Sequence, residues 1–410
     1  MKYVKHAVCI DCGHVMEAKA DLTVCPLCGG LTDIVYDYAA IAQVLNRDVL
    51  AKRSEPTHWR YGELLPVEEE TVPRMAKEGL KVGGSPLYRA DRLAAEIGIK
   101  TLWVKDDGVN PTASMKDRAS SLAVAKALEG GYTTIACSST GNAASSLAGA
   151  CAKAGLESYI FVPERAPKGK VAQLLIFGAH VYCVQGDYGD TFRLSAEAIQ
   201  HYGWYNRNAA INPYLLEGKK TVALELMEQL GWEVPDYVAM SVGDGCSIAG
   251  AWKGLKDLYQ VGLIDKLPRL ISVQAAGCCP VNTAIRGDGK LVPQAENTLA
   301  DSIAVGVPRN FKKAVTAIQE SNGLTVEVTD EEILAAMGLL GRTTGVFGEP
   351  AGVAALAGVK KAREQEMLPG DCSVAYIVTG NGLKDVANGI KAAGEPIFVK
   401  PAFDEFQKVR

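Results

Sequence analysis

Short apolar runs alternate with helical periods along most of the chain, and this alternation constrains the fold more than any other feature. Helical periodicity is expected at 119–128, 217–230, 248–259, 311–320 and 351–364, and a further helix opens with the capping box Thr329-Asp330-Glu331-Glu332. Strand-like runs lie between these helices, at 134–137, 159–162, 181–184, 237–242, 270–274, 324–328 and 374–378. Such alternation is typical of a mostly parallel sheet that helices cover on both faces. The sequence therefore predicts an α/β fold.

Three polar, glycine-containing loops follow strands of this predicted sheet. They are Ser138–Asn142, Gly243–Ser247 and Thr379–Gly382. In an open α/β sheet, ligands bind at the carboxyl ends of the strands. The loop at 243–247 is the best candidate for a phosphate cradle, because its glycines expose backbone N–H groups and a helix N-terminus follows it.

Lys116 lies in the run Asn110-Pro111-Thr112-Ala113-Ser114-Met115-Lys116-Asp117-Arg118, at the predicted start of a small-residue helix. The positive end of the helix dipole, together with partial burial, lowers the pKa of an ammonium group and frees the amine for Schiff-base chemistry. For the tripeptide alone, a surface charge cluster is the alternative. Together with the three loops, the lysine favours a phosphate-bearing aldehyde cofactor, pyridoxal 5′-phosphate.

The order of these motifs resembles the threonine synthase family and its fold-type-II pyridoxal-phosphate relatives, over residues 82–392. Ala113 and Met115 stand where the family usually has glycine and phenylalanine. The resemblance implies a two-domain, tryptophan synthase β-like architecture with the cofactor between the domains. It also implies that relatives commonly form homodimers.

The resemblance also implies roles for individual residues. Lys116 would hold the cofactor as a Schiff base and move the proton at Cα. Asn142 would face the pyridine 3′-oxygen, Ser139 and Thr140 the substrate α-carboxylate, and Thr379 the pyridine nitrogen. The phosphate ligands would be Gly243, Asp244, Gly245, Cys246 and Ser247. Two of these depart from the family pattern. The Asp244 carboxylate must point away from the phosphate or pair with another group, and we interpret Cys246 as a buried small residue rather than a reactive thiol.

The substrate-phosphate ligands of the family are missing at three positions. Ala143, Ala209 and Leu215 replace a hydroxyl residue, an amide and an arginine, respectively. We therefore expect elimination or replacement at the β or γ carbon of a small α-amino acid whose leaving group is not a phosphate bound in the usual way. The alternative is a genuine threonine synthase, acting on O-phosphohomoserine, in which Arg207 or Lys219 rebuilds the phosphate site.

Four cysteines near the N-terminus form two pairs with short spacing, Cys9-x2-Cys12 and Cys25-x2-Cys28. This spacing predicts a zinc ribbon with four thiolate ligands. Disulfides are the alternative, but the other seven cysteines are scattered and no secretory signal precedes them, so we expect a reducing, cytoplasmic setting. A site closed by four cysteines is structural rather than catalytic.

Composition excludes two classes of partner. The net charge is −4 without a dense Lys/Arg block, which argues against nucleic acid, and no apolar run approaches the length of a membrane span. We predict a ribbon at 1–38, an irregular lead-in at 39–81, and α/β domains at 82–225 and 226–410. Two other classes stay open: an inert paralogue that keeps the fold, and a ribbon-based binding module fused to an inert α/β domain.

Overall fold

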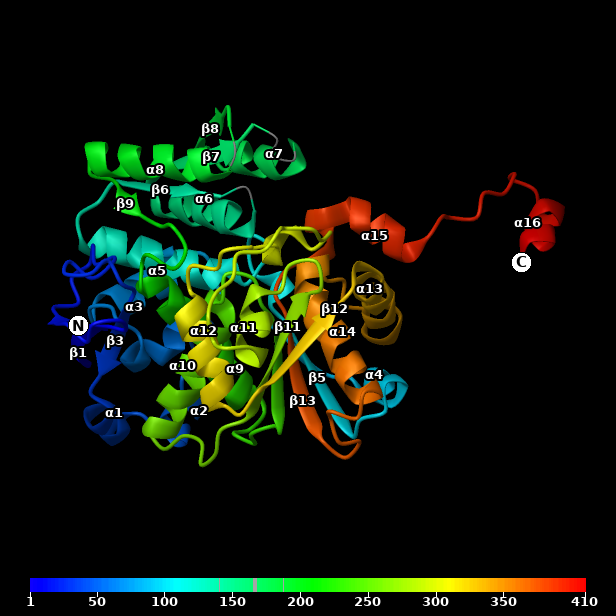
Figure 1. Cartoon of the computed structure of the whole chain (residues 1–410), viewed down its shortest axis with the longest axis horizontal. Helices are drawn as coiled ribbons and strands as arrows, with labels where there is room; N and C mark the ends of the chain where they lie inside the picture. Colours follow the sequence, from blue (N-terminus) through cyan, green and yellow to red (C-terminus); the bar gives the residue numbers. More distant parts are fainter. Residues whose placement is uncertain (140, 165–167, 187) are drawn as a thin grey trace.

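The computed structural model describes residues 1–139, 141–164, 168–186 and 188–410, and within them the strands form three sheets (Figure 1). Two of the sheets are covered by helices, and the third is a small antiparallel sheet at the N-terminus. The predicted α/β architecture is confirmed.

The largest sheet has six strands in the order β12-β11-β10-β13-β5-β4. All neighbours in it are parallel except β4 and β5. Its central strands are buried on both faces, which is why they read as continuous apolar runs in the sequence. The strands are β4 (Leu87–Arg89), β5 (Thr101–Asp106), β10 (Tyr237–Ser241), β11 (Arg269–Ala275), β12 (Leu324–Val328) and β13 (Ser373–Val378).

The second sheet has four parallel strands in the order β8-β7-β6-β9. They are β6 (Thr134–Ser138), β7 (Glu157–Pro163), β8 (His180–Val184) and β9 (Tyr205–Asn206). This sheet and its helices form the upper lobe in Figure 1. The carboxyl end of β6 leads into the first of the three polar loops.

Two apolar cores hold the helices against the sheets. One core joins the largest sheet to α4, α13 and α14, and the other runs through α5, α6, α9 and α10 to the second sheet. The helices of the two α/β lobes are α4 (Asp91–Ile97), α5 (Lys116–Glu129), α6 (Asn142–Ala154), α7 (Lys168–Ile176), α8 (Tyr188–Tyr202), α9 (Tyr214–Gln229), α10 (Cys246–Gln260), α11 (Pro280–Arg286), α12 (Phe311–Glu320), α13 (Asp330–Thr344), α14 (Pro350–Glu364) and α15 (Val386–Ala393). Short 3-10 turns are η2 (Asp107–Val109), η3 (Asp301–Ile303) and η4 (Gly382–Asp385). The capping box before α13 is confirmed.

The N-terminal sheet consists of β1 (Val4–Cys9), β2 (Val15–Met16) and β3 (Thr32–Tyr36). The lead-in expected to be irregular instead folds into four short helices, α1 (Tyr38–Val44), α2 (Arg47–Ala51), η1 (His58–Leu64) and α3 (Thr71–Glu78). Side-chain caps from Asp37, Asn46 and Thr57 start three of them. Packing of Trp59 and Tyr61 into the core holds η1, and such long-range burial leaves no clear periodicity in a short segment.

The sheets do not divide at the predicted domain boundary. The sequence predicted that residues 82–225 form one domain. However, β4 and β5 of this range pair within the largest sheet, where β5 lies beside β13. The chain therefore starts the largest sheet, leaves it to build the second sheet, and returns. A contiguous assignment from sequence misses this, because strand pairing over more than 260 residues leaves no local pattern.

The last segment leaves the body of the molecule. After α15 the chain runs outward and ends in α16 (Phe403–Val409), clear of the two lobes (Figure 1). In the described part of the chain, no helix is long and apolar enough to cross a membrane.

Candidate active site

Lys116 is the first residue of α5, as predicted. The turn before it is joined to the loop after β13 by backbone hydrogen bonds, from Met115 N to Thr379 O (2.9 Å) and from Asn381 N to Ala113 O (3.1 Å). This turn needs a left-handed residue, and Ala113 has φ +66°. The geometry explains why glycine is usual there, because the left-handed region costs a residue with a Cβ about 1–2 kcal/mol. The pairing places Lys116 beside Thr379.

The three residues of the Lys-Asp-Arg run point in different directions. Lys116 lines a pocket. Asp117 accepts hydrogen bonds from the N–H and hydroxyl of Thr112 (2.7 and 2.6 Å), which closes the preceding turn. The buried Arg118 pairs with Asp107 (2.7 Å) and Glu225 (3.1 Å) and so ties α5 to the largest sheet and to α9. The two charges after the lysine thus hold its helix in position.

The loop Gly243–Ser247 lines the same pocket, at the N-terminus of α10. A Cβ on Gly243 would lie 2.8 Å from Ile303 Cα, so only glycine fits. Gly245 has φ +87° and caps the helix without a side-chain hydrogen bond to the first-turn N–H groups. Such N–H groups, at the positive end of the dipole, form an anion site.

Asp244 and Cys246, the two unusual residues of this loop, hydrogen-bond to each other. Asp244 Oδ1 accepts a hydrogen bond from Arg309 N (2.7 Å) and Oδ2 accepts one from the Cys246 thiol (3.2 Å). The carboxylate is therefore engaged by protein donors. Burial raises the pKa of Cys246 to about 11, so its thiol is protonated at neutral pH. This supports the interpretation of Cys246 as a non-reactive residue.

The pocket brings together most of the residues that the sequence singled out. Lys116, the loop 243–247 and Thr379 all line it, although they are far apart in the chain. Lys219, on α9, and Glu349, just before α14, also line it. Lys116 and the loop 243–247 therefore line one pocket, and its use as the cofactor site stays a prediction.

Two groups in the pocket titrate near neutrality. The pKa of Lys116 is lowered to about 8, by burial and then by the positive charge of Lys219. The pKa of Glu349 is raised to about 7, by burial and then by Asp301, while Lys116 opposes the shift. An amine and a carboxyl with pKa values this close can exchange protons at neutral pH.

Of the residues expected near the substrate and the ring oxygen, Asn142 reaches a residue that lines the pocket. Asn142 Nδ2 donates to Glu349 Oε1 (2.7 Å), at the pocket wall. Ser139 Oγ accepts a hydrogen bond from Gly141 N (3.2 Å) in the loop after β6. Thr140 lies outside the described residues. Ser139 is not among the residues that line the pocket, so its contact with substrate stays a prediction.

Glu349 is the site residue that sequence reasoning missed. It precedes Pro350, the first residue of α14, and occupies the N-cap position without making a side-chain cap. An acidic residue before a proline and an apolar helix reads as an ordinary cap. Only the fold turns its side chain toward Asn142 and Lys116.

Pyridoxal phosphate fits this set of residues. The uncapped N-terminus of α10 and the glycine backbone suit a phosphate, and the buried Lys219 adds a positive charge. The lowered pKa of Lys116 suits a lysine that bonds an aldehyde. The Thr379 hydroxyl is a neutral partner for a pyridine nitrogen.

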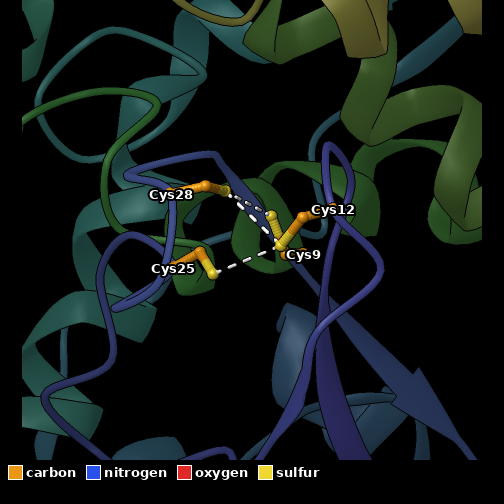
Figure 2. Close-up of side chains that lie close together, drawn as sticks. All are labelled: Cys9, Cys12, Cys25 and Cys28. Atoms are coloured by element: carbon orange, nitrogen blue, oxygen red, sulfur yellow. Dashed lines mark hydrogen bonds between the residues drawn. The ribbon is translucent and has the colours of Figure 1, made fainter.

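The four N-terminal cysteines form a second cluster (Figure 2), and none of them is among the residues that line this pocket. Their sulfur atoms all lie within 4.8 Å of one another; Cys9 and Cys28 are 3.5 Å apart, and Cys12 and Cys25 are 3.7 Å apart. Four sulfurs around one zinc ion at about 2.3 Å would be roughly 3.8 Å apart. The geometry thus fits a tetrahedral metal site, and no disulfide joins the described cysteines.

Known proteins share the fold. The tomato (Solanum lycopersicum) threonine deaminase isoform 2 superposes with a TM-score of 0.64 at 21% identity, over 76% of this chain and 83% of that one. The Escherichia coli diaminopropionate ammonia lyase gives a TM-score of 0.67 at 19% identity, over 79% and 90% of the two chains. Both matches establish the fold-type-II architecture.

Sequence comparison establishes the family. The family model for pyridoxal-phosphate dependent enzymes matches residues 79–380. The threonine synthase of Methanosarcina acetivorans is 40% identical over 98% of both chains, and that of Methanocaldococcus jannaschii is 40% identical over 96% of both. The chain therefore belongs to the pyridoxal-phosphate-dependent enzymes, in the branch that includes the threonine synthases.

Proposed function

We propose that this enzyme converts O-phosphohomoserine and water to threonine and phosphate. The observation that carries the proposal is the position of Arg207, a buried guanidinium near the pocket. Two of its nitrogens, Nε and Nη2, donate to Ser120 Oγ (3.2 and 3.0 Å). Among the described residues, no carboxylate lies within ion-pair distance of it. A buried cation without a counter-ion is costly, and an anionic substrate group offsets that cost.

Arg207 does not itself line the pocket, but it lies near residues that do. Ser120 follows Lys116 by one helical turn, so the two side chains lie on one face of α5. The charge of Arg207 contributes to the lowered pKa of Lys116. Ala209, two residues after Arg207, lines the pocket. Arg207 therefore supplies a positive charge where the family's amide and arginine are absent.

The remaining residues support proton transfer at the substrate. Pyridoxal phosphate, when bound, supplies the electron sink that makes the substrate Cα–H acidic. Lys116 would take and return the proton at Cα, and its pKa of about 8 suits this role. The adjacent Glu349, with a pKa of about 7, would hold a proton for the neighbouring carbons. Lys219, beside the loop 243–247, would pair with the cofactor phosphate.

A second candidate is a lyase that acts on an unphosphorylated amino acid, the first choice from the sequence. It is favoured by Ala209, which offers the pocket only a methyl group, and by Leu215, which is 1% exposed within an apolar core. Neither residue can bind a phosphate. The two candidate functions therefore differ in whether Arg207 binds a substrate phosphate in place of the residues lost at positions 209 and 215.

Steady-state kinetics separate the two candidates. The holoenzyme is incubated with O-phosphohomoserine and, separately, with unphosphorylated amino acids such as serine and homoserine. Release of threonine and phosphate with kcat/KM of about 10⁴ M⁻¹s⁻¹ or more supports the proposal. Turnover of only the unphosphorylated compounds refutes it and favours the second candidate.

The variant Arg207→Met tests the residue itself. Loss of a charge-assisted contact costs about 1.5–3 kcal/mol, so kcat/KM for the phosphorylated substrate should fall roughly 10- to 150-fold. The cofactor absorbance should persist. Arg47→Met is the matched control, because Arg47 donates to Leu263 O far from the pocket, and it should leave kcat/KM unchanged. An equal effect of both variants would contradict the role of Arg207.

We also propose that the four-cysteine cluster binds a structural zinc ion. Its four Sγ atoms close the coordination sphere, so the metal would have no position open for a substrate. Metal analysis of the purified protein should find one zinc per chain, which C9S/C12S should abolish.

A further inference from the structure

The C-terminal segment carries an unusual density of exposed apolar side chains. We call residues 394–410 the arm. Its side chains Ile397, Phe398 and Phe403 are 72%, 84% and 71% exposed, and Phe406 and Val409 are also exposed. The arm extends away from both lobes, so its own chain does not cover these side chains (Figure 1). Apolar side chains gathered in this way mark an interaction surface.

The short helix at the end of the arm also indicates that this segment packs against another surface. Helix α16 has only seven residues, and helices shorter than about 12 residues are marginal in water without packing. Phe403 and Phe406 are one turn apart, with ring centroids separated by 6.3 Å, and so form one apolar face. This face needs a surface to pack against for the helix to persist.

The body offers an apolar stripe next to the root of the arm. It consists of Phe347, Leu383, Val386 and Ile390, which are 41%, 72%, 52% and 57% exposed. The last three recur at helical spacing along η4 and α15. The Phe347 ring packs against this segment, since a Cβ on Gly389 would lie 2.9 Å from it. We call these four residues the body stripe.

The charges of the two surfaces are complementary. Arg342 and Lys391 flank the end of the body stripe, and among the described residues neither has an ion-pair partner. The arm carries Glu395 and Asp404, which likewise have none in the described part of the chain. The arm as a whole has three acidic and three basic side chains, so it lacks the excess of positive charge that favours a lipid surface.

We propose that the arm of one copy packs on the body stripe of a second copy, in a two-fold exchange. Residues 394–402 are extended and can span roughly 30 Å, which is enough to cross to a neighbouring molecule. A two-fold arrangement forms the contact twice, and each copy contributes both an arm and a stripe. The exchange covers the exposed apolar side chains of both surfaces at once and pairs Asp404 with Lys391.

Sedimentation of the full-length holoenzyme tests the exchange. We expect the wild type to be a dimer at micromolar concentration. The variant F398S/F403S/F406S should dissociate at least about 1,000-fold more readily, since each buried phenylalanine contributes tenfold or more to association. Its cofactor absorbance and circular dichroism should match the wild type. Ile176→Ser, which removes an 84% exposed apolar side chain on α7, is the matched control and should remain dimeric.

Charge reversal and cross-linking identify the contact itself. Lys391→Glu should weaken the dimer, and adding Asp404→Lys should restore it. A carbodiimide cross-link between Lys391 and the α16 carboxylates should join ¹⁵N-labelled to unlabelled chains in a mixed dimer. The proposal fails if the wild type is monomeric, if the triple serine variant dimerises as tightly as the wild type, or if the cross-links stay within one chain. Binding of the wild type, as a monomer, to phosphatidylserine vesicles would also overturn it.

Discussion

Replacing Gly245 with alanine should weaken cofactor binding while the apoenzyme still folds. Gly245 has φ +87°, and a Cβ there would lie 2.7 Å from Ala314 Cβ and 3.1 Å from Asn310 O. In Gly245→Ala, the left-handed backbone costs about 1–2 kcal/mol and the overpacking about 1–3 kcal/mol. The apoenzyme can relieve this by shifting the loop, whereas a bound phosphate needs the loop in place. The dissociation constant of pyridoxal phosphate should therefore rise roughly 30- to 5,000-fold.

Two further variants divide this cost into its parts. Gly262→Ala, just beyond the other end of α10, has φ +77° and meets no atom within 4 Å. It should lose about 1–2 kcal/mol of stability and bind the cofactor normally. Gly245→Ala combined with Ala314→Gly should recover the part due to overpacking. The assay is a titration of the visible absorbance of the bound cofactor, with thermal unfolding of each apoenzyme. Wild-type affinity in Gly245→Ala would refute the assignment of this loop to the phosphate.

Five more predictions concern the candidate site and the cysteine ribbon. Lys116→Ala should abolish the visible absorbance of the bound cofactor while leaving the circular dichroism of the apoenzyme unchanged. A retained absorbance band would show that another residue forms the Schiff base. The rate at which the apoenzyme captures pyridoxal phosphate should rise about tenfold per pH unit below pH 8 and level off above it, because the pKa of Lys116 is lowered to about 8 and only the neutral amine reacts. Glu349→Gln should move that midpoint to lower pH, since the negative carboxylate raises the pKa of Lys116, and stopped-flow absorbance would reveal a shift in the opposite direction. Ala113→Gly should raise the free energy of unfolding by about 0.5–1 kcal/mol in urea titrations, because it relieves the backbone at φ +66°. Chelation of the metal should increase proteolysis of the first 38 residues and leave most of the cofactor absorbance, because no residue of the cysteine ribbon is among those that line the pocket; simultaneous loss of both would show that the ribbon supports the cofactor site.

The candidate site was predictable where its chemistry depends on local sequence. Lys116 starts a helix, glycines precede α10, and four cysteines have ligand spacing, and each of these patterns is readable within about twenty residues. Glu349 could not be recognised in this way, and Arg207 could be named only as one of two alternatives near the substituted phosphate ligands. Their importance comes from burial beside Lys116, and their neighbours in the sequence look like an ordinary helix cap and an ordinary loop.

The sequence by itself determined the α/β class, the order of most strands and helices after residue 118, the candidate Schiff-base lysine and the cysteine cluster with ligand spacing. These follow from periodicity and spacing, which are properties of short segments. Only the tertiary structure decided that β5 lies beside β13, that the turn at Ala113 is joined to Asn381, and that the arm leaves the body. Such pairings depend on which distant surfaces bury each other best, and that balance is set by the whole chain rather than by any one segment.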